Sequence, residues 1–343
     1  MTNPRGISAA LAAAVLFGAS TPFSKLLLGD IGPWLLAGLL YLGSGVGLTA
    51  LRLFARGGQA RLGRGEWPWL LGAVLAGGVA GPVLLMYGLA GAAASTASLL
   101  LNAEGVFTAV LAWVAFKENA DRRIVLGMAA IVCGAVVLSW PGGVVAASWP
   151  ALAVLGACLC WAVDNNLTRK VSLSDPLQVA AVKGLAAGAT NLALALALGA
   201  SLPPPGSVAA AAAVGVFGYG LSLATFVVAL RELGAARTGA YFSTAPFVGA
   251  AVSVLLLGEA VTLRLLAAAA LMGAGVWLHL TERHDHLHTH QAVEHAHAHT
   301  HDEHHRHHGG DAPAGAHVHW HRHEPLTHRH PHYPDAHHQH RHD

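Results

Sequence analysis

Charged and amide side chains lie within otherwise apolar stretches of the first 280 residues. A charged group at the centre of a membrane helix costs about 2.5–3.5 kcal/mol, so such residues are functional candidates by default. A carboxylate there can bind a cationic group or a proton, and amide groups can orient a solute. The first-tier candidates for substrate binding are Glu104, Asn102, Asp164, Asn165, Lys183 and Asn191.

Glu104 has two interpretations. In the first, it lines a polar cavity and binds a cationic group or a proton there. In the second, Glu104 and Lys183 form a buried ion pair that fixes the packing of two helices. The two are compatible, because a transporter can use such a pair as its gate. A desolvated Glu104 that exchanges a proton would suit proton-coupled antiport.

All 24 histidines lie at or after His279, and many alternate with another residue. In an extended chain alternate side chains point to the same side, so each row presents imidazoles that one metal ion can gather. Nitrogen-rich sites without thiols suit Ni²⁺, Co²⁺, Cu²⁺ and Zn²⁺. The alternative is a solvated tail that responds to pH, since histidine titrates near pH 6.5. The predicted metal ligands are His284, His286, His288, His290, His295, His297, His299, His301, His317, His319, His321 and His323.

These two sets of residues belong to chemically different parts of the chain. Residues 1–280 contain 15 Lys and Arg and 9 Asp and Glu, whereas residues 281–343 contain 23 His, 5 Arg and 9 Asp and Glu. Only 11% of all residues are charged, against about 25% in soluble domains, and the mean hydropathy is +0.49. This composition excludes an ordinary cytosolic enzyme. The second part has almost no apolar residues and is predicted to be disordered.

The first part divides into apolar segments long enough to cross a bilayer, which takes about 20 residues. Short breaks rich in Gly and Pro separate them. The three cysteines, Cys133, Cys158 and Cys160, are interpreted as small apolar fillers within these segments. The ten predicted spans are 7–28, 33–54, 67–89, 92–115, 121–140, 149–170, 176–199, 207–230, 237–257 and 262–280.

The distribution of basic residues predicts the orientation of these spans. If the N-terminus is cytoplasmic, twelve basic residues in the connections and span ends lie on the cytoplasmic side, and Lys25 and Arg264 lie on the other. Cytoplasmic loops carry an excess of Lys and Arg. We therefore expect a multi-pass protein of the inner (cytoplasmic) membrane with both termini, and so the histidine tail, in the cytoplasm.

The spans form an internal repeat. An offset of 141 residues places 89–138 over 230–279 without gaps and aligns Glu118 with Glu259. An offset of 144 aligns the first span of each half. Two five-helix copies must cross the bilayer in opposite senses, because five is odd. Inverted repeats are typical of secondary transporters, whose substrate site lies between the halves.

The repeat also assigns roles to individual residues. Glu118 and Glu259 are expected to share a structural role, such as capping the next helix. Tyr241 and Ser243 occupy the positions related to Leu100 and Asn102, which makes them second-tier candidates for lining the site.

Four stretches resemble EamA-type proteins of the drug/metabolite transporter superfamily: LFGASTPFSKLLL, ASTASLLLNAEGVFTAVLAWVAFKE, WAVDNNLTRK and GAARTGAYFSTAPFVGAAVSVLLLGE. The resemblance covers about residues 7–280 and implies the fold and membrane transport, but not the substrate. In that family the fourth span of each repeat has a proline and then a glutamate. Pro246 and Glu259 fit this pattern, whereas Glu104-Gly105 stands where the first half would have its proline.

The predicted fold class is an all-α membrane protein with ten transmembrane helices in two inverted five-helix repeats and a disordered His-rich tail. The expected parts are 1–140, 141–280 and 281–343. The predicted function is transport of a small solute by alternating access, with a metal-binding cytoplasmic tail. The alternatives are a Ni, Co or Zn transporter that uses the tail as collector or sensor, and a non-transporting metal-storage or sensor protein.

An enzyme is not predicted, because no histidine precedes His279 and the spans offer no paired catalytic groups. No cofactor is expected to be required, although the tail should bind a divalent Ni, Zn, Co or Cu ion. The expected partners are the lipid bilayer and a small-molecule or ion substrate, with proton coupling and a homodimer left open. No nucleic-acid partner is expected.

Overall fold

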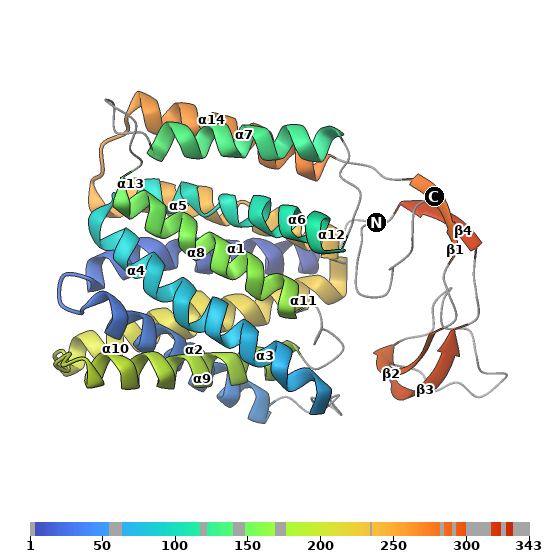
Figure 1. The fold of residues 1–343 in the computed structure, drawn as a ribbon, viewed down its shortest axis with the longest axis horizontal. Coiled ribbons are helices and arrows are strands. Elements are labelled where there is room, and N and C mark those ends of the chain that lie inside the picture. Colours follow the sequence, from blue (N-terminus) through green and yellow to red (C-terminus); the bar gives the residue numbers. More distant parts are fainter. Residues whose placement is uncertain are drawn as a thin grey trace.

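The computed structural model describes residues 4–54, 64–116, 122–139, 148–168, 176–233 and 235–281. Beyond these it describes 285–289, 293–299, 317–323 and 327–331. The first set of ranges forms a bundle of helices, and the second set forms strands at one end of that bundle (Figure 1).

The helices of the first half are α1 (Pro4–Leu27), α2 (Pro33–Phe54), a 3-10 turn (Arg64–Glu66), α3 (Trp67–Ala73), a π-helical segment (Val74–Ala80), α4 (Gly81–Gly91), α5 (Ala94–Leu100), α6 (Ala103–Phe116) and α7 (Arg122–Ser139). Those of the second half are α8 (Trp149–Thr168), α9 (Pro176–Ala197), α10 (Pro205–Val214), a π-helical segment (Gly215–Leu221), α11 (Ser222–Leu233), α12 (Ala235–Phe242), α13 (Ala245–Leu257) and α14 (Leu263–Leu280).

Within the described ranges, eight helical stretches are long and apolar enough to cross a bilayer. Two further apolar helices, Ala245–Leu257 and Leu263–His279, are shorter. The chain is therefore a multi-pass membrane protein, and the count of ten spans stays a prediction. Large apolar side chains such as Leu53, Leu255 and Leu263 are more than 80% exposed, as expected for helices whose outer surface meets lipid.

The two halves share the same irregularities at the same offset. The π-helical segments begin at Val74 and Gly215, which are 141 residues apart. The fourth span is broken in each half, between α5 and α6 and again between α12 and α13. The offset found in the sequence thus also relates local backbone structure.

Contacts between the halves are reciprocal. α2 packs along α9, and α7 packs along α14, so equivalent helices meet each other. α1 packs against α11 and α13, while its equivalent α8 packs against α4 and α6. Such an exchange of partners is what a two-fold relation between the halves produces.

Small residues allow the close contact between α2 and α9. A Cβ added at Gly45 would clash with the backbone nitrogen of Leu185, and one at Gly188 would clash with that of Leu42. Glycine at these positions lets the two backbones approach, as is common where membrane helices cross.

The helix that follows Glu259 is capped by another residue. Thr262 Oγ1 accepts a hydrogen bond from the Leu265 N–H at the start of α14 (3.1 Å). Glu259 instead accepts from the first residues of α5, in the other half. The expected capping role is therefore correct in kind but wrong in its target, because the partner comes from the tertiary arrangement. Glu118 lies outside the described residues.

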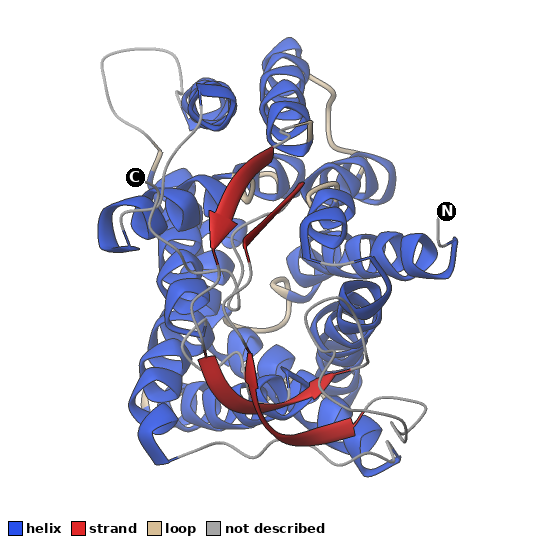
Figure 2. Cartoon of the chain, turned by 90° about the vertical axis from the view of Figure 1, so that its right-hand side faces the viewer, coloured by secondary structure: helices blue, strands red, loops and turns tan. Residues whose placement is uncertain are grey.

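The tail contains strands, so the prediction that it is wholly disordered is wrong for the four segments described. β1 (Asp285–Thr289) pairs antiparallel with β4 (Thr327–Pro331), and β2 (Val293–His299) pairs antiparallel with β3 (His317–His323). Figure 2 shows both pairs in front of the helix ends. A composition without apolar residues excludes a buried core, but it does not prevent two alternating segments from pairing their backbones.

Candidate functional site

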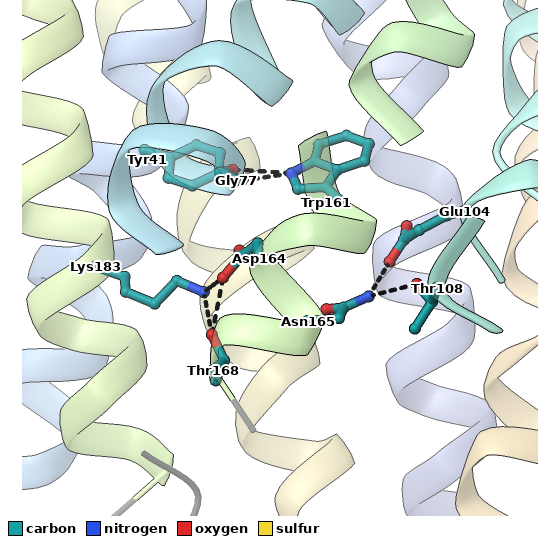
Figure 3. A network of polar contacts seen from close by, with 9 residues as sticks. All are labelled: Tyr41, Gly77, Glu104, Thr108, Trp161, Asp164, Asn165, Thr168 and Lys183. Atoms are coloured by element: carbon teal, nitrogen blue, oxygen red, sulfur yellow. Dashed lines mark hydrogen bonds and ion pairs between the residues drawn. The ribbon is translucent and has the colours of Figure 1, made fainter. Parts of the chain in front are cut away.

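A polar network crosses the interface of α8 with α9. Lys183 Nζ on α9 forms an ion pair with Asp164 Oδ1 on α8 and donates to Thr168 Oγ1 (3.2 Å). Thr168 Oγ1 in turn donates to Asp164 Oδ1 (2.8 Å). Asp164 and Thr168 are one helical turn apart, so both reach the same ammonium group. These three residues form an internally neutralised group on one side of α8 (Figure 3).

Glu104 interacts with the other side of α8. Asn165 Nδ2 donates to Glu104 Oε1 (2.9 Å) and to Thr108 Oγ1 (3.3 Å), as Figure 3 shows. The next residue, Asn166, donates to the Thr108 carbonyl oxygen (3.3 Å). Glu104 lies in the first turn of α6, where the helix dipole favours a negative charge. Asn165 is exposed and Glu104 is half-buried, so this edge between α6 and α8 is accessible.

The expected Glu104–Lys183 ion pair is wrong, because Lys183 pairs with Asp164. The physical reason is the position of α8. Asp164 and Asn165 are consecutive, and consecutive residues on a helix do not share a face. Asp164 therefore faces Lys183 while Asn165 faces Glu104, and α8 separates the two groups. The network of Glu104, Asp164 and Lys183 has a formal charge of −1.

A second cluster of donors converges on the π-helical segment of the first half. The Gly77 carbonyl oxygen accepts from Tyr41 Oη (3.0 Å) on α2 and from Trp161 Nε1 (2.9 Å) on α8. The neighbouring Gly78 carbonyl accepts from Asn191 Nδ2 (3.1 Å) on α9. π-helical turns disturb the regular backbone pattern and occur often at functional sites.

Sequence analysis did not identify Tyr41, Gly77 or Trp161. The available signal was the Gly77-Gly78 pair within an apolar span that also contains Pro82. The predicted residue Asn191 is fully buried on the π-helical segment and is not bonded to Glu104 or Lys183.

The other predicted lining residues lie at the two helix breaks. Asn102 Nδ2 donates to the Leu99 carbonyl oxygen (2.9 Å) and approaches Met272 Sδ (3.9 Å), so this side chain holds the α5–α6 break. Tyr241 and Ser243 are half-buried at the α12–α13 break, where the Tyr241 carbonyl oxygen accepts from Thr244 Oγ1 (2.6 Å). The structure thus brings Glu104, Asn165, Asp164 and Lys183 around α8 and leaves these three outside that network.

Two hollows in the described part of the bundle are not lined by the Glu104 network. One opens at the surface between Trp34, Tyr87 and Ala200, and a small one of about 140 Å³ lies beside Thr21 and Pro246. No cluster of three or more His, Cys, Asp or Glu side chains able to hold a metal occurs among the residues the structure describes. The three cysteines are free: Cys133 is exposed, Cys158 is buried and Cys160 is intermediate.

Nine of the twelve predicted metal ligands lie on strands. His286 and His288 are on β1, three are on β2 and four are on β3. The register places His295, His297 and His299 opposite His321, His319 and His317. The remaining predicted ligands His284, His290 and His301 lie outside the described residues.

An all-helical body with eight candidate spans, reciprocal halves and polar residues between helices defines a membrane transporter fold. The chain belongs to the EamA-like transporter family, which matches residues 4–140 and 148–281. This membership makes it a membrane transporter of small solutes rather than an enzyme.

Two individual proteins are similar to this chain. An uncharacterized transporter from Methanothermobacter thermautotrophicus is 28% identical over 274 residues, covering 74% of this chain and 80% of that protein. A protein of known crystal structure shares the fold, with a TM-score of 0.60 and 22% identity, covering 80% of this chain and 98% of the other.

Proposed function

We propose that the protein is a secondary transporter that moves a small solute carrying a positive charge across the cytoplasmic membrane by alternating access. The observation that carries this proposal is the accessible Glu104–Asn165 edge, 2.9 Å between Asn165 Nδ2 and Glu104 Oε1, on helices from different halves. Substrate sites of inverted-repeat transporters lie at such interfaces.

Charge supports a cationic solute. Asp164 and Lys183 neutralise each other, and the remaining charge is the Glu104 carboxylate. A lone carboxylate among membrane helices attracts a cation strongly, because the effective dielectric constant there is lower than in water. The Asn165 amide and the Thr108 hydroxyl add hydrogen-bonding groups within reach of the same solute.

Glu104→Gln tests this proposal. In proteoliposomes with an internal pH dye, we expect organic amines to evoke proton movement that their neutral amide analogues do not evoke. Removing the charge should lower that signal at least about tenfold, since the loss of a charge-assisted bond costs about 1.5–3 kcal/mol. Glu66→Gln, the same change in the turn before α3, serves as the control.

Two results would contradict the proposal. One is transport by Glu104→Gln at the parental rate with unchanged pH dependence. The other is an equal loss of signal in Glu66→Gln, which would indicate damage to the protein rather than to a binding site.

The membrane and orientation are part of the proposal. The excess of basic residues on one side supports a cytoplasmic-membrane protein with both termini in the cytoplasm. Figure 1 is consistent with this arrangement, because the start of α1 and the end of α14 lie at the same end of the bundle.

We further propose that the tail binds a divalent transition metal such as Ni²⁺ or Zn²⁺. Paired residues of an antiparallel ladder share a face, so the register of β2 with β3 gathers six histidine positions there. The pairs His286–His330 and His288–His328 repeat this arrangement between β1 and β4. Neutral imidazole is a good ligand for these ions.

Metal binding is tested by equilibrium dialysis of the full-length protein against the chain truncated after Thr281. We expect binding of Ni²⁺ at pH 7.5 that is absent from the truncated chain and lost near pH 5.5, where imidazole is protonated. Replacing His295, His297, His319 and His321 with Gln should weaken binding more than the same change at His337, His338, His340 and His342. Equal effects of the two quadruple changes would contradict a site organised by the register.

A further inference from the structure

Lys25 holds the end of α4. Its Nζ donates to the carbonyl oxygens of Leu89 (2.6 Å), Ala90 (3.2 Å) and Ala92 (2.9 Å). These are carbonyls at the C-terminal end of a helix, which lack partners within the helix and carry the negative end of its dipole. Lys25 comes from the last turn of α1.

Glu259 holds the start of α5 on the other side of the same break. Its Oε1 accepts from the Ala94 N–H (2.6 Å) and its Oε2 from the Ser95 N–H (2.8 Å). These N–H groups form the positive end of the α5 dipole. Between the two ends the backbone of Ala92 is extended. Glu259 belongs to the connection between α13 and α14, in the second half of the chain.

We call Lys25, Glu259 and the α4–α5 break 89–95 the clamp. Through it, α1 and the break, both of the first half, are tied to the α13–α14 connection of the second half. The ends of α4 and α13 meet at the end of the bundle opposite the strands of the tail (Figure 1). The clamp thus closes the seam between the halves at one end.

Polar groups without partners lie within the bundle just inside the clamp. The hydroxyls of Ser24 on α1 and Ser98 on α5 are fully buried and make no hydrogen bond. The small hollow between α1, α5 and α13 is lined by Ser98, Thr21 and Pro246 among others. A buried hydroxyl without a partner costs free energy, so a line of them needs a reason.

We propose that the clamp is the gate at one end of the solute pathway, and that the closed pathway behind it runs between α1, α5 and α13 past Ser24, Ser98 and Thr21. This inference rests on the proposed function, because a gate requires alternating access. The clamp is suited to reversible opening. Its bonds join charged side chains to helix ends, and water can replace them when the halves separate.

Cysteine labelling tests the gate without a substrate. The reporter is Ser98→Cys, in a background in which Cys133, Cys158 and Cys160 are alanine. Labelling by a membrane-impermeant maleimide is measured in intact cells and in inverted vesicles. We expect Lys25→Met and Glu259→Gln each to raise the labelling rate about tenfold from one side of the membrane, because each removes charge-assisted bonds that hold the closed state.

Two control variants separate a gate from general loosening. Thr262→Ala removes the cap of α14, three residues from Glu259, and should leave labelling close to the parental rate. Glu118→Gln, the same change at the repeat-related carboxylate, should not raise labelling from the side that Glu259→Gln opens. An increase in either control equal to that in Glu259→Gln would overturn the proposal, as would unchanged labelling in Lys25→Met.

A charge exchange provides a sharper test. In Lys25→Glu with Glu259→Lys, each charge meets the wrong helix end, so we expect labelling to stay high. Restored protection would show a simple ion pair and would overturn the clamp. The result is independent of the substrate. Labelling that does not change while Glu104→Gln abolishes amine transport would reject the gate alone, and the reverse pattern would reject the role of Glu104.

Discussion

Asp164 and Lys183 show how a membrane helix can carry two opposite charges at little net cost. The ammonium group is held by one carboxylate and one hydroxyl, and the side chains are only 9% and 17% exposed. Removing one member leaves the other charge buried without a partner, whereas removing both leaves neutral groups of similar size.

At this scale we predict that Lys183→Met destabilises the protein more than Lys183→Met with Asp164→Asn. The single change should cost about 3 kcal/mol, the low end for a buried pair, because Lys183 keeps some exposure. Thermal unfolding in detergent measures the difference. If the double variant is less stable than the single one, the two charges do not compensate each other.

Sequence reasoning at the residue scale identified which side chains matter but not how they pair. The cost of charge in lipid is a property of each residue and can be read from the chain. Which of Glu104 and Asp164 meets Lys183 depends on which face of α8 is turned toward α9. That orientation is set by packing over the whole bundle, so the pairing could not be derived from the chain.

At the scale of elements, the α2–α9 crossing depends on glycine. A Cβ at Gly188 would collide with the Leu42 backbone, which belongs to a rigid helix and cannot move aside cheaply. Gly206, in the first turn of α10, has nothing near the position of its Cβ. The two glycines therefore provide a matched pair of sites for the same substitution.

We predict that Gly188→Ala lowers the free energy of unfolding by about 1–3 kcal/mol, the usual cost of overpacking. Gly206→Ala should leave it unchanged or raise it slightly, since alanine favours the helix more than glycine does. Thermal unfolding of both variants in detergent checks this expectation. A Gly188→Ala protein as stable as the parent would show that the helices can separate without cost.

The elements themselves were only partly predictable. Spans follow from hydropathy, because each must bury about 20 residues in lipid. The π-helical segments and the broken fourth spans do not, since hydropathy is the same whether a turn is α or π. The strands of the tail were missed because composition reports on burial and not on backbone pairing.

At the scale of the whole molecule, the transporter body and the histidine tail can be separated experimentally. The family match ends at residue 281, and the strands begin at Asp285. We predict that a chain truncated after Thr281 still inserts and transports, because the polar network and the clamp lie within the helical body.

The metal sensitivity of cells distinguishes the roles of the two parts. Cells carrying the intact protein, the chain truncated after Thr281, or Glu104→Ala are compared on rising Ni²⁺ or Zn²⁺. We expect the phenotype to need the tail and not Glu104, as for a metal-buffering appendage on a transporter of another solute. A phenotype that needs Glu104 would contradict this expectation and favour transport of the metal itself.

The two π-helical segments have a consequence for the history of the chain. A π turn holds an extra residue compared with an α turn, so it arises by insertion of a residue into an α-helix. The insertion stands at the same offset in both halves, and their helices align across it without a gap. The simplest account is one insertion in an ancestral five-helix unit, followed by duplication of that unit. The present asymmetry, with Tyr41 and Trp161 bonded to Gly77, then arose after the copies were joined.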